Sequence, residues 1–390
     1  MKNFIMFAPL LLLINFLVPM KSVAQVSGEV NYSLLYTDNP FRNNSGQEEV
    51  VNFVQPTITF KPFQSEFYAG YSFGYSMFKN LSDRTYYYNS AELNYAFRLD
   101  ADTSEDENVF MGASYIKASN TSSDNYYSYN AYSAFANGKF FLTDNLLLSA
   151  GYGLSGKSYP ALYDLSYFIN SGFTRLSLFL ETKTSLFLEL QLGNKAYSIE
   201  DPSAPVIPVD MQGQMGGMGK GRLGGQQNKY ITTNVMQLRI MPKISQALFQ
   251  GVGANVHYMW QKNLDRNSAI SLSEFMYSDD EDLWDDPYSF EANEIGSELT
   301  IKLPWTSTLK LSAEQSYRNY SEDLAETGTV NQRKDTRTEL WFGLSKEFTE
   351  LPLISTFEAG IEFMRIMNKS NEPTFGYNNN IAMFRIGIGF

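Results

Sequence analysis

The feature that most constrains the fold is a nearly continuous series of segments in which apolar and polar side chains alternate. Between residues 67 and 75, aromatic or small apolar residues occupy the odd positions, with Tyr68, Gly70, Ser72 and Gly74 between them. Between residues 186 and 193, leucine occupies every even position. A period of two residues indicates β-strands with one apolar and one polar face. Segments of ten to sixteen residues with this pattern, rich in Tyr, Phe and Leu, are typical of strands that cross a membrane as a barrel.

The segments predict an all-β fold, a single transmembrane antiparallel up-and-down β-barrel of about sixteen strands, with fourteen as the alternative count. The segment 126–141 is the weakest, because neither of its faces is uniformly apolar. The expected strands are 27–37, 50–62, 64–79, 86–99, 107–118, 126–141, 145–158, 163–180, 185–197, 230–243, 246–262, 289–304, 307–320, 334–348, 353–367 and 376–390.

The connections between these segments support a membrane barrel. Bacterial outer-membrane barrels have short periplasmic turns and longer external loops. If the first strand starts in the periplasm, every one of the longest connections is external, including 198–229 and 263–288. The connections after even strands are mostly short, such as Ile244-Ser245 and Trp305-Thr306, and only Asp100 to Asp106 is longer.

The first residues predict export. Lys2 precedes an apolar run from Phe4 to Pro19, and the small residues Ser22-Val23-Ala24 suit cleavage before Gln25. We therefore expect a cleaved signal peptide at 1–24 and a barrel at 25–390, with a membrane anchor as the alternative for the apolar run. The chain has no cysteine, which excludes a lipoprotein anchor and disulfides, and no second apolar segment is long enough for a transmembrane helix.

The last residues, FRIGIGF, carry a resemblance to a known class. Phe384, Ile386, Ile388 and Phe390 form an apolar face that ends on an aromatic residue. This resembles the C-terminal assembly signal of Gram-negative outer-membrane β-barrel proteins. The resemblance implies an outer-membrane location, contact with outer-membrane lipid and lipopolysaccharide, and recognition by the barrel-assembly machinery.

The Tyr-rich and Asn-rich strands look like those of the Bacteroidota, and no characterised family is identified. Without an N-terminal plug domain, the pattern departs from TonB-dependent transporters. A large secreted β-protein is the alternative.

Charge and histidine content exclude several functions. A formal net charge of −12 makes nucleic acid an unsuitable partner. The single histidine, His257, excludes zinc sites built on several histidines. Some outer-membrane phospholipases and proteases use His with Ser or Asp, but no partner for His257 stands at a recognisable spacing. We therefore expect no enzyme activity and no cofactor.

Projection of the alternation inward predicts a lumen lined by both signs of charge. The expected acidic residues are Glu66, Glu92, Glu189, Glu294, Glu298, Glu314, Glu339, Glu358 and Glu362. The expected basic residues are Arg98, Lys157, Arg175, Lys195, Arg239, Lys302, Lys310, Arg318 and Arg337, with His257 among them on the same side. These charges either line a wetted channel or pair across the wall, for example Glu298 with Lys310 and Glu314 with Lys302.

Two long connections are further candidates. The Gly-rich and Met-containing stretch 202–229 lacks the spacing of a phosphate loop, and it could form a constriction, reach a partner or remain a surface loop. Copper binding by the methionines of this stretch is a further alternative. The acidic stretch 278–289 offers Asp279, Asp280 and Asp282 as possible calcium ligands, although it lacks the glycine of an EF-hand loop.

Two functional hypotheses follow, with a weaker third. The first is a porin-like passive channel for small polar solutes. The second is a closed barrel that acts as a surface anchor, receptor or assembly partner for an external ligand or protein through loops 198–229 and 263–288. The third, suggested by the aromatic content alone, is a transporter for apolar molecules.

Overall fold

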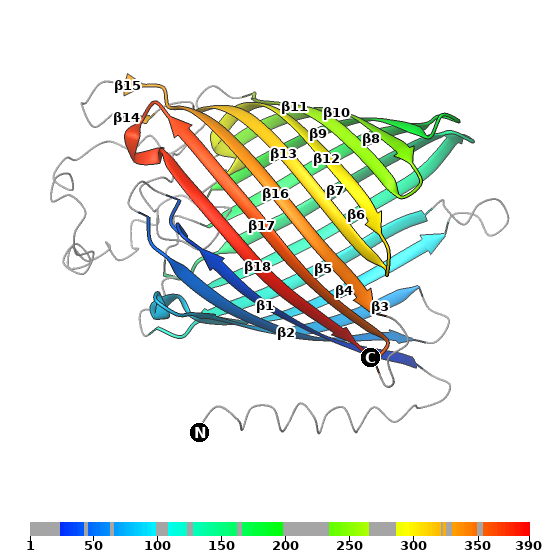
Figure 1. Ribbon diagram of the computed structural model, residues 1–390, viewed down its shortest axis with the longest axis horizontal. Helices are drawn as coiled ribbons and strands as arrows, with labels where there is room; N and C mark the ends of the chain where they lie inside the picture. The colour runs from blue at the N-terminus through cyan, green and yellow to red at the C-terminus, as the bar shows by residue number, and fades with distance from the viewer. Residues whose placement is uncertain are drawn as a thin grey trace.

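The computed structural model describes residues 24–42, 46–62, 66–98, 108–122, 128–161, 166–197, 234–264, 286–320, 323–324, 330–348 and 354–390. Within these residues, sixteen antiparallel strands form one closed barrel in which each strand pairs with its sequence neighbours and β18 closes on β1 (Figure 1). The barrel strands are β1 (Ala24–Thr37), β2 (Glu49–Pro62), β3 (Phe67–Phe78), β4 (Tyr86–Arg98), β5 (Asn108–Asn120), β6 (Tyr129–Thr143), β7 (Leu146–Ser158), β8 (Tyr167–Phe179), β9 (Thr184–Tyr197), β10 (Asn234–Phe249), β11 (Val252–Asn263), β12 (Phe290–Leu303), β13 (Ser307–Tyr320), β16 (Lys334–Phe348), β17 (Thr356–Ser370) and β18 (Tyr377–Gly389).

The elements outside the barrel are short. A hairpin of β14 (Asp323–Leu324) and β15 (Val330–Asn331) lies in the connection between β13 and β16. Among the described residues, three 3-10 turns, η1 (Ser82–Arg84), η4 (Pro287–Ser289) and η5 (Pro373–Phe375), follow or precede strands at one end of the barrel. No helix among the described residues has the length and apolar character needed to cross a membrane.

The strand count and the up-and-down topology agree with the prediction from sequence, and the expected boundaries differ by at most four residues at all connections but one. The expected turn at Ile244-Ser245 is wrong. In the structure β10 continues to Phe249, with Ser245 paired to Asn255 of β11, and the chain reverses at Gln250-Gly251. Gly251 has φ +80°, a left-handed conformation that glycine adopts without a steric penalty.

Three predicted features lie outside the described residues. These are the signal peptide, of which residues 1–23 are not described, the Gly-rich loop 202–229, and the three aspartates Asp279, Asp280 and Asp282. The expected signal peptide, loop constriction, copper binding and calcium site therefore stay predictions.

The outer wall presents apolar side chains to its surroundings. On β9 the four leucines Leu186, Leu188, Leu190 and Leu192 are 38–43 % exposed, while Phe187, Glu189 and Gln191 between them point to the other side and are half-buried. Similar exposed apolar residues, such as Leu93, Ile295 and Ile361, occur around the barrel. In water this surface would be unfavourable, whereas hydrocarbon solvates it and a closed barrel leaves no unpaired strand edge. The protein is an outer-membrane β-barrel.

Tyrosine hydroxyl groups on the outer wall donate hydrogen bonds to asparagines of the neighbouring strand. The pairs are Tyr32 with Asn52 (3.0 Å), Tyr71 with Asn89 (2.6 Å), Tyr115 with Asn130 (2.8 Å) and Tyr258 with Asn293 (2.6 Å). Each asparagine lies within four residues of the same end of the barrel, where β1 ends and β2 begins. Amphipathic tyrosines favour the boundary between hydrocarbon and water, so this band marks one membrane interface.

The C-terminal residues close the barrel. The Phe390 amide donates to the Gly28 carbonyl (3.0 Å), and the Gly28 amide donates to the Phe390 carbonyl (3.1 Å). Phe384, Ile386 and Ile388 are paired with Leu34, Tyr32 and Val30 of β1 on the outer side of the wall. The closing strand therefore contributes an apolar face to the membrane side and backbone hydrogen bonds to the first strand.

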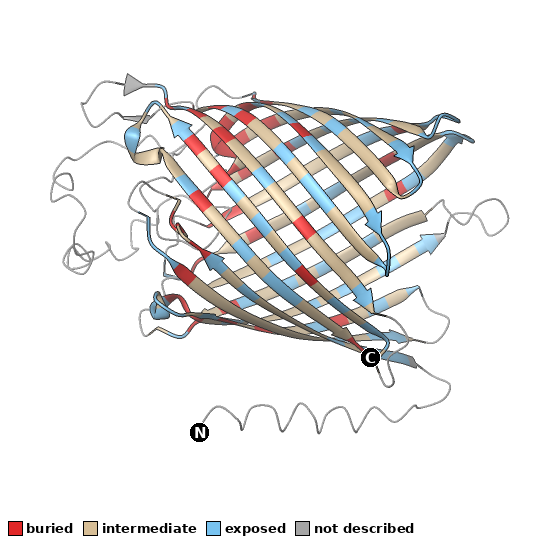
Figure 2. Cartoon of the chain, viewed as in Figure 1, coloured by how far each residue is buried: buried red, intermediate tan, exposed pale blue. Residues whose placement is uncertain are grey.

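Buried residues gather mainly towards the end of the barrel opposite the C-terminus (Figure 2). One buried cluster consists of Tyr159, Tyr167, Tyr197, Val235 and Tyr288, and a second of Phe290, Ala292 and Tyr320. The cluster residues that lie on strands point into the lumen, because their neighbours in sequence face outward, and Tyr288 lies over the inward-facing Gly193. The interior is therefore packed near this end, while side chains nearer the C-terminus are more accessible.

Candidate functional site: the inner wall

The strand register places most of the charged candidates on the inner side of the wall. Those residues are Glu92, Lys157, Arg175, Glu189, Lys195, Arg239, His257, Glu294, Glu298, Lys302, Lys310, Glu314, Arg318, Arg337, Glu339, Glu358 and Glu362. Glu66 precedes β3 and is exposed, and the side chain of Arg98 lies outside the described residues.

Several of these charges form ion pairs along the inner wall. Arg175 donates from Nε to Glu189 Oε2 at 2.7 Å, and Arg337 pairs with Glu339. Arg385 of the closing strand contacts Glu358 at 3.2 Å and Glu362 at 3.3 Å. Arg385 was not among the charged residues predicted from sequence, although its position in FRIGIGF alternates with the apolar residues and therefore belongs to the inner face.

The two ion pairs expected between β12 and β13 are not formed. Glu298 accepts a hydrogen bond from Thr300 Oγ1 (3.2 Å), and Lys302 donates to Thr308 Oγ1 (3.0 Å). The register places Ser312 opposite Glu298 and Thr308 opposite Lys302. Lys310 is therefore only a diagonal neighbour of Glu298, roughly 7–8 Å away between Cα atoms. Glu314 lies six residues along β13 from Thr308, the residue opposite Lys302, and is out of reach of Lys302. In both cases a nearer hydroxyl group forms the hydrogen bond instead.

A different pair is buried near the packed end of the barrel. Lys195 of β9 donates from Nζ to Asp286 Oδ2 at 2.8 Å, and the two side chains are 1 % and 3 % exposed. Tyr197 donates its hydroxyl to the same oxygen at 2.5 Å. The Lys195 ammonium also lies 3.9 Å from the centre of the Tyr167 ring, within cation–π range. This network fixes Asp286, at the end of a long connection, to the inner wall.

The residues after Asp286 continue along the inner wall and are held by amides from the strands. The side-chain amide groups of Gln237 and Gln261 both donate to the Pro287 carbonyl, at 2.6 and 2.7 Å. Asn263 donates to the Tyr288 carbonyl at 3.1 Å. The connection 263–288 was expected to be an external loop, but its last residues turn inward. We call residues 286–289 the inner segment.

Tyr288 of the inner segment lies over Gly193, an inward-facing position of β9. A Cβ atom built at Gly193 would lie 2.1 Å from the Tyr288 hydroxyl oxygen, so only glycine leaves room for the ring. Burial raises the pKa of Tyr288 above its usual value of 10.0, the nearby Arg239 guanidinium lowers it, and the Asp286 carboxylate raises it again. The tyrosine is therefore neutral at physiological pH and adds no charge to the lumen.

Nearer the C-terminus, the inner wall holds a polar cavity of about 500 Å³. Its lining includes Lys302, Lys310 and Arg385 with Glu358 and Glu362. The side chains of Arg385 and Glu358 are 47 % and 49 % exposed, in contrast to the buried pair of Lys195 and Asp286. This part of the lumen is therefore wet and carries both signs of charge.

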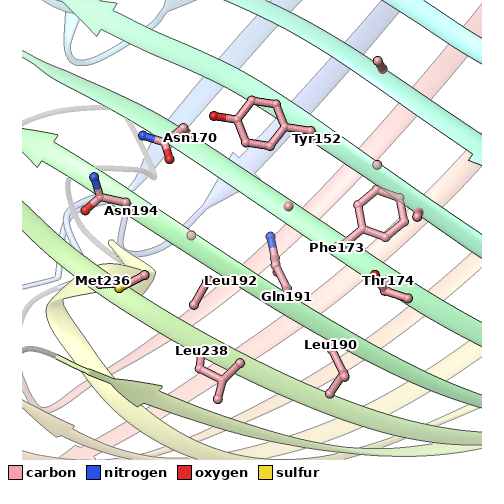
Figure 3. Close-up of a pocket in the computed structure, with 15 residues that line it drawn as sticks. Tyr152, Asn170, Phe173, Thr174, Leu190, Gln191, Leu192, Asn194, Met236 and Leu238 are labelled. Atoms are coloured by element: carbon pink, nitrogen blue, oxygen red, sulfur yellow. The ribbon is translucent and has the colours of Figure 1, made fainter.

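A larger depression, of about 740 Å³, crosses strands β6 to β10 (Figure 3). Leu190, Leu192 and Leu238 line it together with Tyr152 and small residues, and these side chains belong to the outward-facing positions. In the membrane it faces lipid acyl chains. It lacks the charged groups of the inner wall.

Comparisons with known proteins add no family assignment. No protein-family model and no curated protein matches the chain. Among solved structures, the chain is similar to a bacterial polysaccharide outer membrane secretin (TM-score 0.49, 10 % identity, covering 93 % of this chain and 98 % of that one). It is also similar to OccAB1 of Acinetobacter baumannii (0.47, 9 %, 94 % and 96 %) and to OprD of Pseudomonas aeruginosa (0.44, 11 %, 94 % and 95 %). Likeness at this level transfers no function to the chain.

Proposed function

We propose that the protein is a passive, porin-like channel for small polar solutes. The observation that carries the proposal is the contrast within the lumen between half-exposed charges near the C-terminal end and the packed inner segment near the other. A sixteen-stranded barrel encloses more space than its inward side chains fill. Hydrated polar side chains along that space lower the cost of moving a polar solute through it.

The charges on the inner wall support transport with weak charge preference. Arg175 pairs with Glu189, and Arg385 lies between Glu358 and Glu362, so each of these two cations has a carboxylate beside it. Paired charges in a wet environment cancel at distances beyond about 8 Å at physiological salt. We therefore expect solute size to limit passage more strongly than solute charge.

The inner segment is the structural basis for a size limit. It lies against β9, β10 and β11, and its contacts combine a buried ion pair with amide hydrogen bonds to Pro287 and Tyr288. A segment held in place by these contacts narrows the lumen from one side, and no conformational change is needed for this narrowing.

A liposome-swelling assay tests this proposal. Liposomes with the refolded protein should swell in isosmotic solutions of pentoses and hexoses, and more slowly with each larger sugar up to trisaccharides. Matched liposomes with heat-denatured protein serve as the control. Swelling no faster than in the control, with correct folding shown by heat-modifiable migration on a gel, would contradict the channel.

A closed barrel that acts as a surface anchor is the second candidate, and one observation favours it. Inward side chains from several strands, including Gln237, Asn263 and Ile366, are at most 7 % exposed near one end. A lumen filled there would stop solutes. The same swelling assay separates the two functions, because an anchor gives no swelling with any sugar.

A further inference from the structure

The single histidine of the chain lies beside two glutamates on the inner wall. His257 of β11, Glu294 of β12 and Glu314 of β13 each offer one ligand atom, and these atoms all lie within 4.8 Å of one another. The side chains of His257 and Glu294 are 21 % and 13 % exposed. The group is therefore partly enclosed, yet still open to ions in the lumen.

The strand register explains why these three side chains converge. His257 is paired with Gly296, and Gly296 is paired with Glu314. His257, Gly296 and Glu314 therefore form one inward-facing row across β11, β12 and β13. A Cβ atom at Gly296 would lie 2.2 Å from His257 Cε1, which shows that the imidazole occupies the space above the glycine. Glu294, two residues along β12 on the same face, reaches this space from the side.

The separation of the ligand atoms suits a metal ion better than a hydrogen bond. His257 Nε2 lies 3.5 Å from Glu294 Oε1, whereas charge-assisted hydrogen bonds are about 2.7–2.9 Å long. Two ligands at about 2.1 Å from a tetrahedral ion are roughly 3.4 Å apart. The observed distance therefore leaves room for an ion between the two groups with little movement.

Charged side chains from several strands surround the two carboxylates. Glu339, paired with Glu314 in the register, is engaged by Arg337. Arg318, further along β13, donates to Ser316 and lies 4.5 Å from the Phe290 ring centre. Lys243 of β10 lies opposite His257, and Arg239 and Arg318 also interact electrostatically with Glu294. Two carboxylates at this separation repel each other, and a divalent cation relieves that repulsion.

We propose that His257, Glu294 and Glu314 form a binding site for a divalent transition-metal ion, with Zn²⁺ as the representative ion. His257 Nε2 and one oxygen of each glutamate supply three ligands, and water from the lumen completes a tetrahedral set. The imidazole favours Zn²⁺ and related ions over Ca²⁺ and Mg²⁺, which bind oxygen ligands in larger numbers. The metal site does not depend on the proposed channel function, because metal binding requires only that the barrel wall is folded.

Isothermal titration of the refolded protein in detergent with Zn²⁺ tests this site. We expect one ion per chain, at least a tenfold weaker dissociation constant for His257→Ala and for Glu314→Gln, and unchanged binding in excess Mg²⁺. Glu298→Gln is the matched control, because Glu298 lies on the same strand and face as Glu294 but outside the group. Its binding should equal that of the unchanged protein.

Gly296→Ala provides a second variant that keeps all three ligands. Its added methyl group displaces the imidazole, so it should also weaken Zn²⁺ binding while the folded band on a heat-modifiability gel is retained. Absence of stoichiometric Zn²⁺ binding to the unchanged protein would overturn the proposal. Equal affinity of the folded His257→Ala variant would overturn it as well.

Discussion

Lys195 and Asp286 form a buried ion pair, 2.8 Å between Nζ and Oδ2, that joins the inner wall of β9 to the end of a connection 91 residues further along the chain. Both partners are almost fully buried, so the pair sits in a low-dielectric environment where removal of one charge leaves the other uncompensated. The pair therefore decides whether the inner segment stays against the wall.

Asp286→Asn should release the inner segment. An unpaired buried ammonium costs about 3–5 kcal/mol, which at least equals the contribution of the three amide hydrogen bonds to Pro287 and Tyr288 at about 1 kcal/mol each. Hydrogen–deuterium exchange of the peptide that contains residues 287–290 should become faster. Glu358→Gln is the control, because that ion pair is half exposed and such pairs contribute less than about 1 kcal/mol. Unchanged exchange in Asp286→Asn would show that the ion pair does not hold the segment.

Gly193→Ala should displace the same segment by steric conflict with the Tyr288 hydroxyl group. The chain has no cysteine, so Ser289→Cys introduces a unique and buried reporter of accessibility. We expect maleimide labelling at Cys introduced there to be at least tenfold faster when Gly193→Ala is added. Gly253→Ala is the matched control, since its Cβ would lie 3.8 Å from the nearest atom. Equal labelling rates in the two backgrounds would contradict the packing of Tyr288 on Gly193.

The raised pKa of Tyr288 predicts a pH effect above neutrality. Because the folded-state pKa lies above the unfolded value of about 10, the contribution of Tyr288 to stability is complete below that pH. It is lost as the pH rises through the folded pKa. The free energy of unfolding should therefore fall more steeply above pH 10 in the unchanged protein than in Tyr288→Phe. Urea titrations at several alkaline pH values measure this difference, and parallel curves would contradict it.

Removal of Phe390 should reduce barrel assembly. It removes both backbone hydrogen bonds that join the last residue to Gly28 and shortens the apolar face of the closing strand. The fraction of folded protein in isolated outer membranes should drop severalfold, whereas Phe390→Tyr, which retains the ring and the backbone groups, should assemble nearly normally. Equal folded fractions for deletion and unchanged chain would show that the closing strand tolerates the loss.

The barrel could be predicted because each strand repeats one simple physical requirement. An apolar outer face and a polar inner face impose a period of two residues, and this period sets strand number and direction. The wrong prediction of a turn at Ile244-Ser245 shows what the alternation of apolar and polar residues does not determine. Alternation continues through both β10 and β11, so only Gly251 marks the reversal, and its positive φ is visible only in the structure.

The contacts between side chains could not be derived from the sequence in the same way. Whether Glu298 lies opposite Lys310 or opposite Ser312 depends on a shift of two residues in register, which alternation does not determine. The meeting of His257 with Glu294 and Glu314 depends on the same register across three strands. The sequence pattern gives no indication that the chain turns into the lumen at Asp286, because single hydrogen bonds and one ion pair hold it there.

Single-channel conductance in a planar bilayer tests the central claim most directly, with the unchanged protein and Asp286→Asn compared under the same salt. A wetted lumen narrowed by the inner segment predicts steady open steps in the unchanged protein and larger steps in the variant. Silence from both proteins, with folding confirmed on a heat-modifiability gel, would contradict the channel and identify a closed barrel.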